Sequence, residues 1–177
     1  MHSPVGVRAA CIDIGSNTTR LLVADCVEGE LQEVHQERAF TRIGQGLRSS
    51  GTIAAAKIEE VVTVVHGQMA VAREHGAHEI RGVATAAIRV ASNGTALVEA
   101  IAAGTGLMVE IVSGEEEARL AFRGAAAMLD ADTAALLGAS GRSASLGVID
   151  VGGGSSEVVV GSAPDRVGWW ASVPLGS

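Results

Sequence analysis

A short pattern occurs twice in this chain, once near each end. The first copy reads IDIGSNT, over Ile12–Thr18, and the second reads IDVGGGS, over Ile149–Ser155. Apolar residues resume after each copy, at Leu21–Ala24 and at Val158–Val160. An apolar run, a tight turn rich in small residues and a second apolar run together predict a β-hairpin. The chain is therefore expected to contain two β-hairpins of the same design.

Both turns have the composition of an anion-binding loop. Gly and Ser residues allow several backbone N–H groups to point into one turn, where they can hold phosphate oxygens. An Asp precedes each turn, Asp13 in the first copy and Asp150 in the second, and such a carboxylate can hold a metal ion or orient a water molecule. An Asp at a strand end is often only a turn former, but two in matched positions favour a functional site. Two such hairpins that face each other would grip a phosphate chain from both sides.

The composition is that of a globular protein with an acidic surface. Hydrophobic residues make up 47% of the 177 residues and charged residues 19%, an ordinary balance for a globular chain. The net charge of -7 disfavours nucleic acids and membrane surfaces as partners, because both are anionic. The sequence has neither an apolar run of about 18 residues nor a start typical of a signal peptide. We therefore expect a cytoplasmic protein with no nucleic-acid partner and no membrane partner.

The rest of the sequence predicts a mixed α/β fold. The helix that starts near Ser113 has the signature of a capping box, since Glu116 follows three residues later. The expected strands cover residues 7–14, 19–26, 30–37, 79–84, 107–112, 146–151, 156–161 and 167–173. The expected helices cover residues 52–74, 96–103 and 113–130, and we expect loops over 38–50 and 85–93.

The second hairpin repeats the pattern with which the first domain begins, and this repetition indicates a second domain. We expect a first domain over residues 1–124 and the beginning of a second, incomplete domain over 125–177. The second part has predicted strands but no helix to cover them, and a small sheet with uncovered apolar faces is poorly stable alone. We therefore expect a fragment or a shortened form of a larger two-domain protein, in which a homodimer is one way to cover that sheet.

Further motifs narrow the assignment. The duplicated hairpins alone resemble those of actin, sugar kinases and heat-shock chaperones. Three segments accompany them: ATAAIR at Ala84–Arg89 with Asn93 beyond it, SGEEEARL at Ser113–Leu120, and DVGGGSSE at Asp150–Glu157. In this order and spacing they resemble the Ppx/GppA family of exopolyphosphatases and guanosine pentaphosphate phosphohydrolases. The resemblance implies the actin-like ATPase (ribonuclease H-like) fold and covers the amino-terminal part of a usual family member.

The resemblance also implies a reaction. Family members hydrolyse the terminal phosphoanhydride bond of inorganic polyphosphate or the 5′ γ-phosphate of guanosine pentaphosphate, with Mg²⁺ or another divalent metal. The catalytic glutamate of the family matches Glu117. A carboxylate near a helix start beside a phosphate pocket can orient and deprotonate an attacking water molecule. By sequence alone Glu115 and Glu116 compete for this role, and all three carboxylates can also serve only to stabilise the helix N-terminus.

The remaining site residues are expected to bind phosphate or metal. The candidate phosphate ligands are Gly15, Ser16, Asn17, Thr18, Arg42, Arg89, Gly152, Gly153, Gly154 and Ser155. The candidate metal ligands are Asp13, Asp150 and Glu157. For Arg89 the alternative is an ordinary solvated arginine, and for Glu157 it is an exposed strand carboxylate.

Two other functions stay open on the sequence. One is a truncated module that binds a nucleotide or polyphosphate without turnover, which the incomplete second domain favours. The other is a kinase or ATPase of the same superfamily, which would need an adenosine pocket that the second domain usually supplies. The glutamate-rich segment with Glu117 before Ala118–Leu120 favours the phosphatase. The sequence does not choose between polyphosphate and guanosine pentaphosphate.

Overall fold

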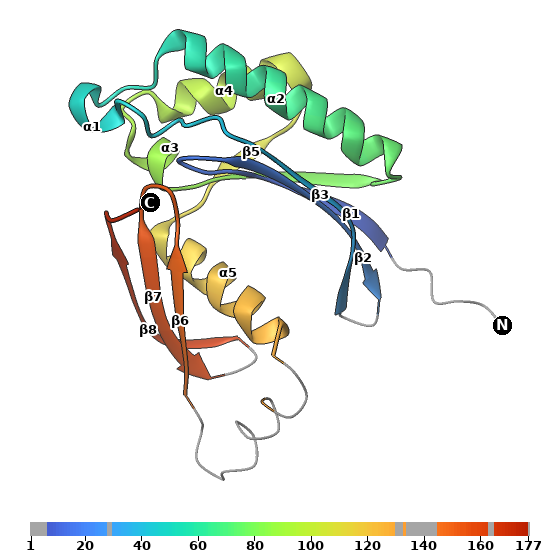
Figure 1. Ribbon diagram of the computed structural model, residues 1–177. Coiled ribbons are helices and arrows are strands. Elements are labelled where there is room, and N and C mark those ends of the chain that lie inside the picture. The colour runs from blue at the N-terminus through green and yellow to red at the C-terminus, as the bar shows by residue number, and fades with distance from the viewer. Residues whose placement is uncertain (1–6, 28–29, 130–132, 134–144, 163–164, 177) are drawn as a thin grey trace, which may run out of the picture. The chain divides into compact units, whose positions relative to one another are not determined.

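The computed structural model describes residues 7–27, 30–129, 133, 145–162 and 165–176 (Figure 1). The chain divides into two compact units, Met1–Val112 and Ser113–Ser177. This division comes earlier than the expected boundary after residue 124, because the helix that opens the second unit packs on the second sheet. The boundary between folding domains of the protein stays a prediction.

The first unit is built on a five-stranded mixed sheet in the order β3-β2-β1-β4-β5. Strand β1 pairs antiparallel with β2 and parallel with β4, β2 pairs antiparallel with β3, and β4 pairs parallel with β5. The carboxyl ends of β1, β4 and β5 therefore lie along one edge of the sheet. The strands span Val7–Ile14 (β1), Thr19–Val27 (β2), Glu30–Ala39 (β3), Glu79–Ala84 (β4) and Val109–Ile111 (β5).

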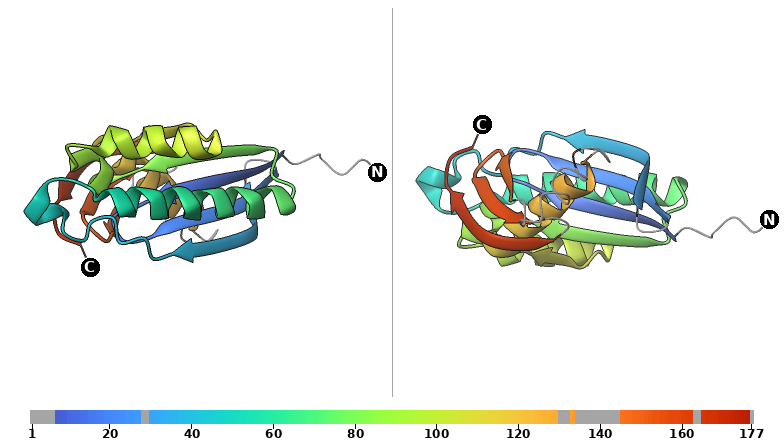
Figure 2. Two further views of the ribbon diagram at one scale, coloured as in Figure 1. Left: turned by 90° about the horizontal axis from the view of Figure 1, so that it is seen from above. Right: turned by 90° about the horizontal axis from the view of Figure 1, so that it is seen from below.

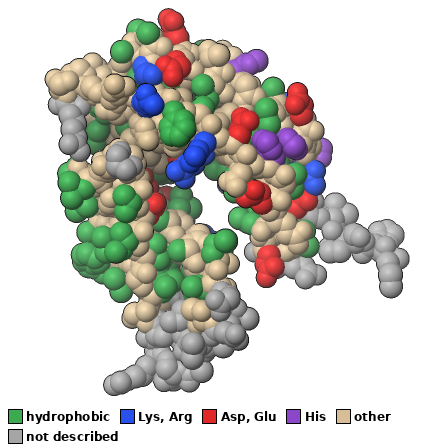
Figure 3. Space-filling view, viewed as in Figure 1, with side chains coloured by type: hydrophobic (Ala, Val, Ile, Leu, Met, Phe, Trp, Pro, Cys, Tyr) green, Lys and Arg blue, Asp and Glu red, His purple; other side chains and the backbone are tan. Residues whose placement is uncertain are grey.

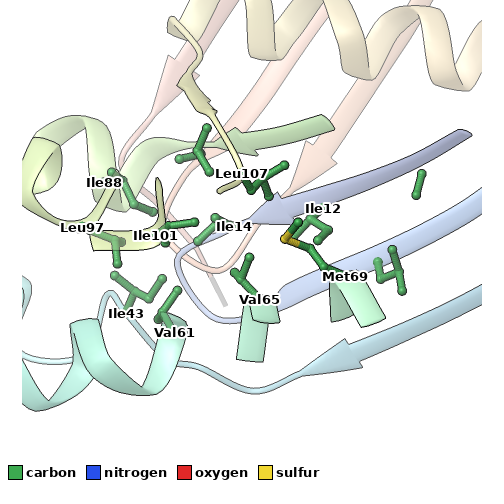
Figure 4. Close-up of a cluster of buried hydrophobic side chains, with 14 of the residues drawn as sticks. Ile12, Ile14, Ile43, Val61, Val65, Met69, Ile88, Leu97, Ile101 and Leu107 are labelled. Atoms are coloured by element: carbon green, nitrogen blue, oxygen red, sulfur yellow. The ribbon is translucent and has the colours of Figure 1, made fainter. Parts of the chain in front are cut away.

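Two long helices cover one face of this sheet, α2 over Ala55–Glu74 and α4 over Gly94–Thr105 (Figures 1 and 2). The period of two along β1 places Ile12 and Ile14 on the covered face, where both are fully buried, and places Asp13 on the opposite face. The core between sheet and helices is aliphatic (Figure 4). Its labelled members are Ile12, Ile14, Ile43, Val61, Val65, Met69, Ile88, Leu97, Ile101 and Leu107.

Both segments expected as loops contain a short helix, which corrects the sequence-based assignment. Helix α1 covers Leu47–Ser50 and helix α3 covers Ala86–Val90. Four or five residues are too few to show a helical period in a sequence. Helix α3 exists because its apolar residues are buried, including Ile88, which is only 1% exposed. Tertiary packing, rather than local periodicity, therefore forms α3.

The second unit has a three-stranded antiparallel sheet with one helix on it. The strands β6 (Leu146–Val151), β7 (Ser156–Ser162) and β8 (Arg166–Val173) pair in the order β6-β7-β8. Helix α5 (Gly114–Ala127) packs against all three strands. The expectation that no helix covers the second sheet was thus wrong for one face, because the helix that precedes the second hairpin supplies that cover.

The small core of the second unit lies between α5 and β7. Ala118 and Phe122 from the helix and Val159 from the strand are each fully buried. The other face of the sheet carries apolar residues that stay exposed, including Ile149 at 71%, Val151 at 63% and Trp169 at 56%. Hydrophobic side chains accordingly gather over the three-stranded sheet in the space-filling view (Figure 3). This exposed face agrees with the expected shortage of cover on the second sheet.

Within the described part of the chain, no helix combines the length and the apolar composition that crossing a membrane requires.

We predict that Phe122→Ala lowers the free energy of unfolding of the second unit by about 3–5 kcal/mol, the usual cost of removing a buried aromatic side chain. The measurement is urea unfolding followed by tryptophan fluorescence, because both tryptophans of the chain, Trp169 and Trp170, lie in β8. Leu120→Ala is the control, since Leu120 lies on the same helix and is 44% exposed. An equal loss in the two variants would contradict the packing described here.

Candidate active site

The turns of the two hairpins are closed by the same kind of backbone hydrogen bond. The N–H of Gly15 donates to the carbonyl of Thr18 at 2.9 Å, and the N–H of Gly152 donates to the carbonyl of Ser155 at 2.9 Å. A Cβ at Gly15 would lie 3.1 Å from the Thr18 oxygen, and a Cβ at Gly152 would lie 3.0 Å from the Ser155 oxygen. Both distances are tighter than an ordinary van der Waals contact, so each turn closes around a residue without a side chain. The prediction of two hairpins of one design is confirmed, while phosphate binding by them stays a prediction.

Two backbone hydrogen bonds connect the first turn to the segment that follows β3. The N–H of Arg42 donates to the carbonyl of Asn17 at 2.9 Å, and the N–H of Gly44 donates to the carbonyl of Ser16 at 2.8 Å. Arg42 has a φ of 48°, the left-handed region that residues other than glycine rarely adopt. Such strain persists only where surrounding contacts hold it, and it is frequent at functional sites. The structure thus places Arg42 directly beside the first turn.

Arg89 lies at the same edge of the first sheet. The N–H of Thr85 donates to the carbonyl of Ile14 at 3.2 Å, and the N–H of Val112 donates to the carbonyl of Ala84 at 3.0 Å. These bonds continue the parallel ladder past the strand ends. The Nη1 of Arg89 then donates to the carbonyl of Val112 at 2.8 Å. Arg89 is therefore half-buried and anchored rather than an ordinary solvated arginine.

Asp150 and Glu157 stand directly opposite each other across β6 and β7. Asp150 is exposed, whereas Glu157 is 1% exposed, which rules out the alternative of an exposed strand carboxylate. The hydroxyl of Ser172 on β8 donates to Oε1 of Glu157 at 2.8 Å. Burial of a carboxylate is costly unless hydrogen bonds or a cation compensate it. A buried carboxylate with a hydrogen-bond donor is typical of a functional residue and not of a surface residue.

The first turn of α5 lies at the hairpin end of the second sheet. Near the far end of β7, a Cβ on Gly161 would lie 2.9 Å from Cζ of Phe122. Ala118, one turn earlier on the helix, packs in the cluster around Val159. Figure 1 shows the N-terminal end of α5 at the same end of this unit as the β6–β7 turn, and Glu117 lies in the first turn of α5. Glu117 and the loop Gly152–Ser155 thus lie at the same end of this unit.

The three glutamates of that turn have different surroundings. Ser113 accepts a hydrogen bond from the N–H of Glu116 at 3.1 Å, as the capping signature predicts. The carboxylate of Glu116 then pairs with Arg119 at 2.7 Å, and the hydrogen bond from that guanidinium lowers the pKa of Glu116. Glu115 is exposed and Glu117 is half-buried. The position of Glu117 is thus compatible with the predicted catalytic role, which stays a prediction.

The candidate metal ligands do not form one cluster in the described residues. Within those ranges, no group of three or more His, Cys, Asp or Glu side chains could hold a metal ion. Asp13 belongs to the first unit, and the opposed pair of Asp150 and Glu157 belongs to the second. Carboxylate oxygens are the ligands that Mg²⁺ prefers, so the chemistry of these three residues fits such an ion. Their role as metal ligands stays a prediction.

Comparisons with known proteins agree with the geometry of the chain. The sequence model of the Ppx/GppA phosphatase family matches residues 22–177. Exopolyphosphatase 2 of Mycobacterium tuberculosis is 37% identical over 163 residues, an alignment that covers 87% of this chain and 48% of that protein. The chain thus spans about half the length of the curated relatives that it matches.

Solved structures show the same fold. The crystal structure of the Aquifex aeolicus Ppx/GppA family member superposes with a TM-score of 0.79 at 30% identity and covers 96% of this chain and 52% of the other. An exopolyphosphatase-like protein superposes with a TM-score of 0.83 at 29% identity, with coverages of 98% and 52%. These likenesses confirm the expected actin-like α/β fold and the match to the amino-terminal half of the relatives.

We predict that Ser172→Ala lowers the free energy of unfolding of the second unit by about 1–3 kcal/mol, because it removes the hydrogen bond to a buried carboxylate. Urea unfolding followed by tryptophan fluorescence measures this loss. Ser145→Ala, at an exposed position directly before β6, is the matched control and should change stability little. A Ser172→Ala variant as stable as this control would mean that Glu157 does not depend on that hydroxyl.

Proposed function

The chain belongs to the Ppx/GppA phosphatase family, and on that premise we propose that it hydrolyses the terminal phosphoanhydride bond of inorganic polyphosphate or the 5′ γ-phosphate of guanosine pentaphosphate. The observation that carries this proposal is the position of Glu117 at the same end of the second unit as the glycine loop Gly152–Ser155. The 37% identity to a protein named exopolyphosphatase 2 supports the reaction class.

Phosphate oxygens would be held by the turns of the two hairpins. Backbone N–H groups of residues 16–18 and 153–155 would donate to these oxygens, as such nests of N–H groups do for anions, while the N–H groups of Gly15 and Gly152 close the turns. Arg42 and Arg89 would neutralise phosphate charge, because a guanidinium matches the geometry of a phosphate group. In a chain of net charge -7, these arginines make the site locally favourable for a polyanion.

Glu117 would act as the general base. A water molecule held by its carboxylate would attack the terminal phosphorus in line with the bridging oxygen, while one water proton passes to the carboxylate. The bond between the terminal phosphorus and the bridging oxygen breaks, and that oxygen leaves with the rest of the phosphate chain. Catalysis of this kind rests on positioning and on stabilisation of the charge that develops in the transition state.

A divalent cation would complete the site. Asp13, Asp150 and Glu157 supply the oxygen ligands that we propose for Mg²⁺, and the ion would neutralise charge on the phosphate oxygens. The opposed placement of Asp150 and Glu157 across β6 and β7 supports their share of this assignment.

A binding module without turnover is the second candidate. The observation that favours it is that the closed turns at Gly15 and Gly152 need no catalytic carboxylate in order to hold phosphate oxygens. Such a module would keep the phosphate loops and bind polyphosphate or a guanosine nucleotide without hydrolysis. The family match makes a kinase or ATPase of the same superfamily the weaker alternative.

We predict that Glu117→Gln lowers the rate of phosphate release by about 100-fold or more, the usual contribution of a general base. The assay measures phosphate released from long-chain polyphosphate and from guanosine pentaphosphate in the presence of Mg²⁺. Glu115→Gln is the matched control, because Glu115 is exposed on the same helical turn and its loss should change the rate little.

The outcomes separate the two candidates. Release that is lost in Glu117→Gln and kept in Glu115→Gln supports the hydrolase and identifies its preferred substrate. Binding of either substrate without release by the unmodified chain would refute the hydrolase and support the binding module. Equal rates in both variants would exclude Glu117 as the base.

A further inference from the structure

Two arginines oppose each other on the face of the first sheet that α2 and α4 leave uncovered. Arg20 on β2 and Arg38 on β3 are direct cross-strand partners, and both side chains are exposed. The Cα atoms of such partners lie about 4.5–5.5 Å apart. Like charges placed directly opposite on neighbouring strands destabilise a sheet. An anion bound between them would offset this repulsion.

The pair adjoins the first phosphate loop. Nε of Arg20 donates to the hydroxyl of Thr18, the last residue of that loop, at 3.3 Å. The hydroxyls of Thr19 and Thr41 lie 3.0 Å apart in a buried hydrogen bond, which fastens the start of β2 to the segment after β3. The arginine pair therefore lies next to the first loop, on strands that a buried hydrogen bond connects at this end.

The guanidinium of Arg38 contacts an aromatic ring rather than a carboxylate. It lies 5.3 Å from the ring centroid of Phe40, which is 55% exposed. Among the residues that the structure describes, no carboxylate forms an ion pair with Arg38. Arg20, in contrast, has Asp13 as its direct partner on β1. The contact with Phe40 holds the guanidinium in place without removing its charge.

We propose that Arg20 and Arg38 form a second phosphate subsite, which binds the phosphate groups of the substrate beyond the one held in the first loop, with Phe40 as the positioning residue for Arg38. This inference rests on the proposed function. Guanidinium groups bind phosphate oxygens through paired charge-assisted hydrogen bonds. The ligand chemistry is a linear run of linked phosphates, which either inorganic polyphosphate or a guanosine pentaphosphate can supply.

The test is the binding of orthophosphate, tripolyphosphate and guanosine pentaphosphate, measured by isothermal titration calorimetry. All variants are made in the Glu117→Gln background, so that binding is read without turnover. We expect Arg38→Gln to weaken tripolyphosphate binding about tenfold, the usual effect of losing one hydrogen-bonded charge, and to change orthophosphate binding less than twofold. Arg73→Gln is the matched control, because it removes the same charge from an exposed position in the last turn of α2.

Two further variants protect the test against misfolding. Arg38→Lys keeps the charge but loses the paired hydrogen bonds, and Phe40→Leu keeps Arg38 but loses the aromatic ring. Both should weaken tripolyphosphate binding by a smaller factor than Arg38→Gln does, with unchanged circular dichroism. A loss confined to tripolyphosphate or to guanosine pentaphosphate supports the subsite and identifies the source of the phosphates.

Two results would overturn the subsite. One is equal weakening in Arg38→Gln and Arg73→Gln, which would show a general effect of charge. The other is equal affinity of the parent chain for orthophosphate and tripolyphosphate. The proposed hydrolysis is tested separately. If these binding differences are found but the unmodified chain releases no phosphate, the hydrolysis is refuted and the subsite is not.

Discussion

The tight turn that closes each hairpin is the constraint on which the rest of the site depends. In both turns a glycine N–H donates to a carbonyl three residues later, and no Cβ fits comfortably at that glycine. Because the turn sets the register of the strand pair, it also decides which residues face each other. Asp13 thereby stands opposite Arg20, and Asp150 stands opposite Glu157. The same kind of turn thus produces two different cross-strand pairs. One is an aspartate opposite an arginine, and the other is two opposed carboxylates.

The parallel strands of the first sheet determine which residues lie near the first turn. Since β1, β4 and β5 run in the same direction, the residues that follow them converge on one edge. This topology brings Arg89 to the edge from which the first turn projects, and backbone bonds from the segment after β3 add Arg42. Residues distant in sequence therefore meet around one loop.

Much of the fold was predictable because its signals are local. Alternating apolar residues mark β1, glycines mark the turns, and the pair of Ser113 and Glu116 marks the start of α5. What the sequence could not reveal depends on tertiary contacts. Helix α3 forms because residues such as Ile88 are buried, and α5 covers the second sheet because Phe122 packs there.

The surroundings of the site residues also depend on tertiary contacts and could not be predicted from the sequence. The sequence identified Arg42 and Glu157 as candidates through a family resemblance, but it did not reveal their surroundings. Arg42 has a left-handed backbone and donates its N–H to the carbonyl of Asn17, which lies in a separate segment of the chain. The burial of Glu157 comes from its place on the central strand of a sheet covered by a helix. Neither property has a periodic signature in the sequence.

The central proposal is that the backbone N–H groups of each hairpin turn bind phosphate oxygens. Its most direct test is a titration of the ¹⁵N-labelled protein with tripolyphosphate, followed by the amide resonances of Gly15–Thr18 and Gly152–Ser155. The account predicts that both sets of resonances shift as tripolyphosphate is added. Resonances that stay unchanged in either set would contradict it.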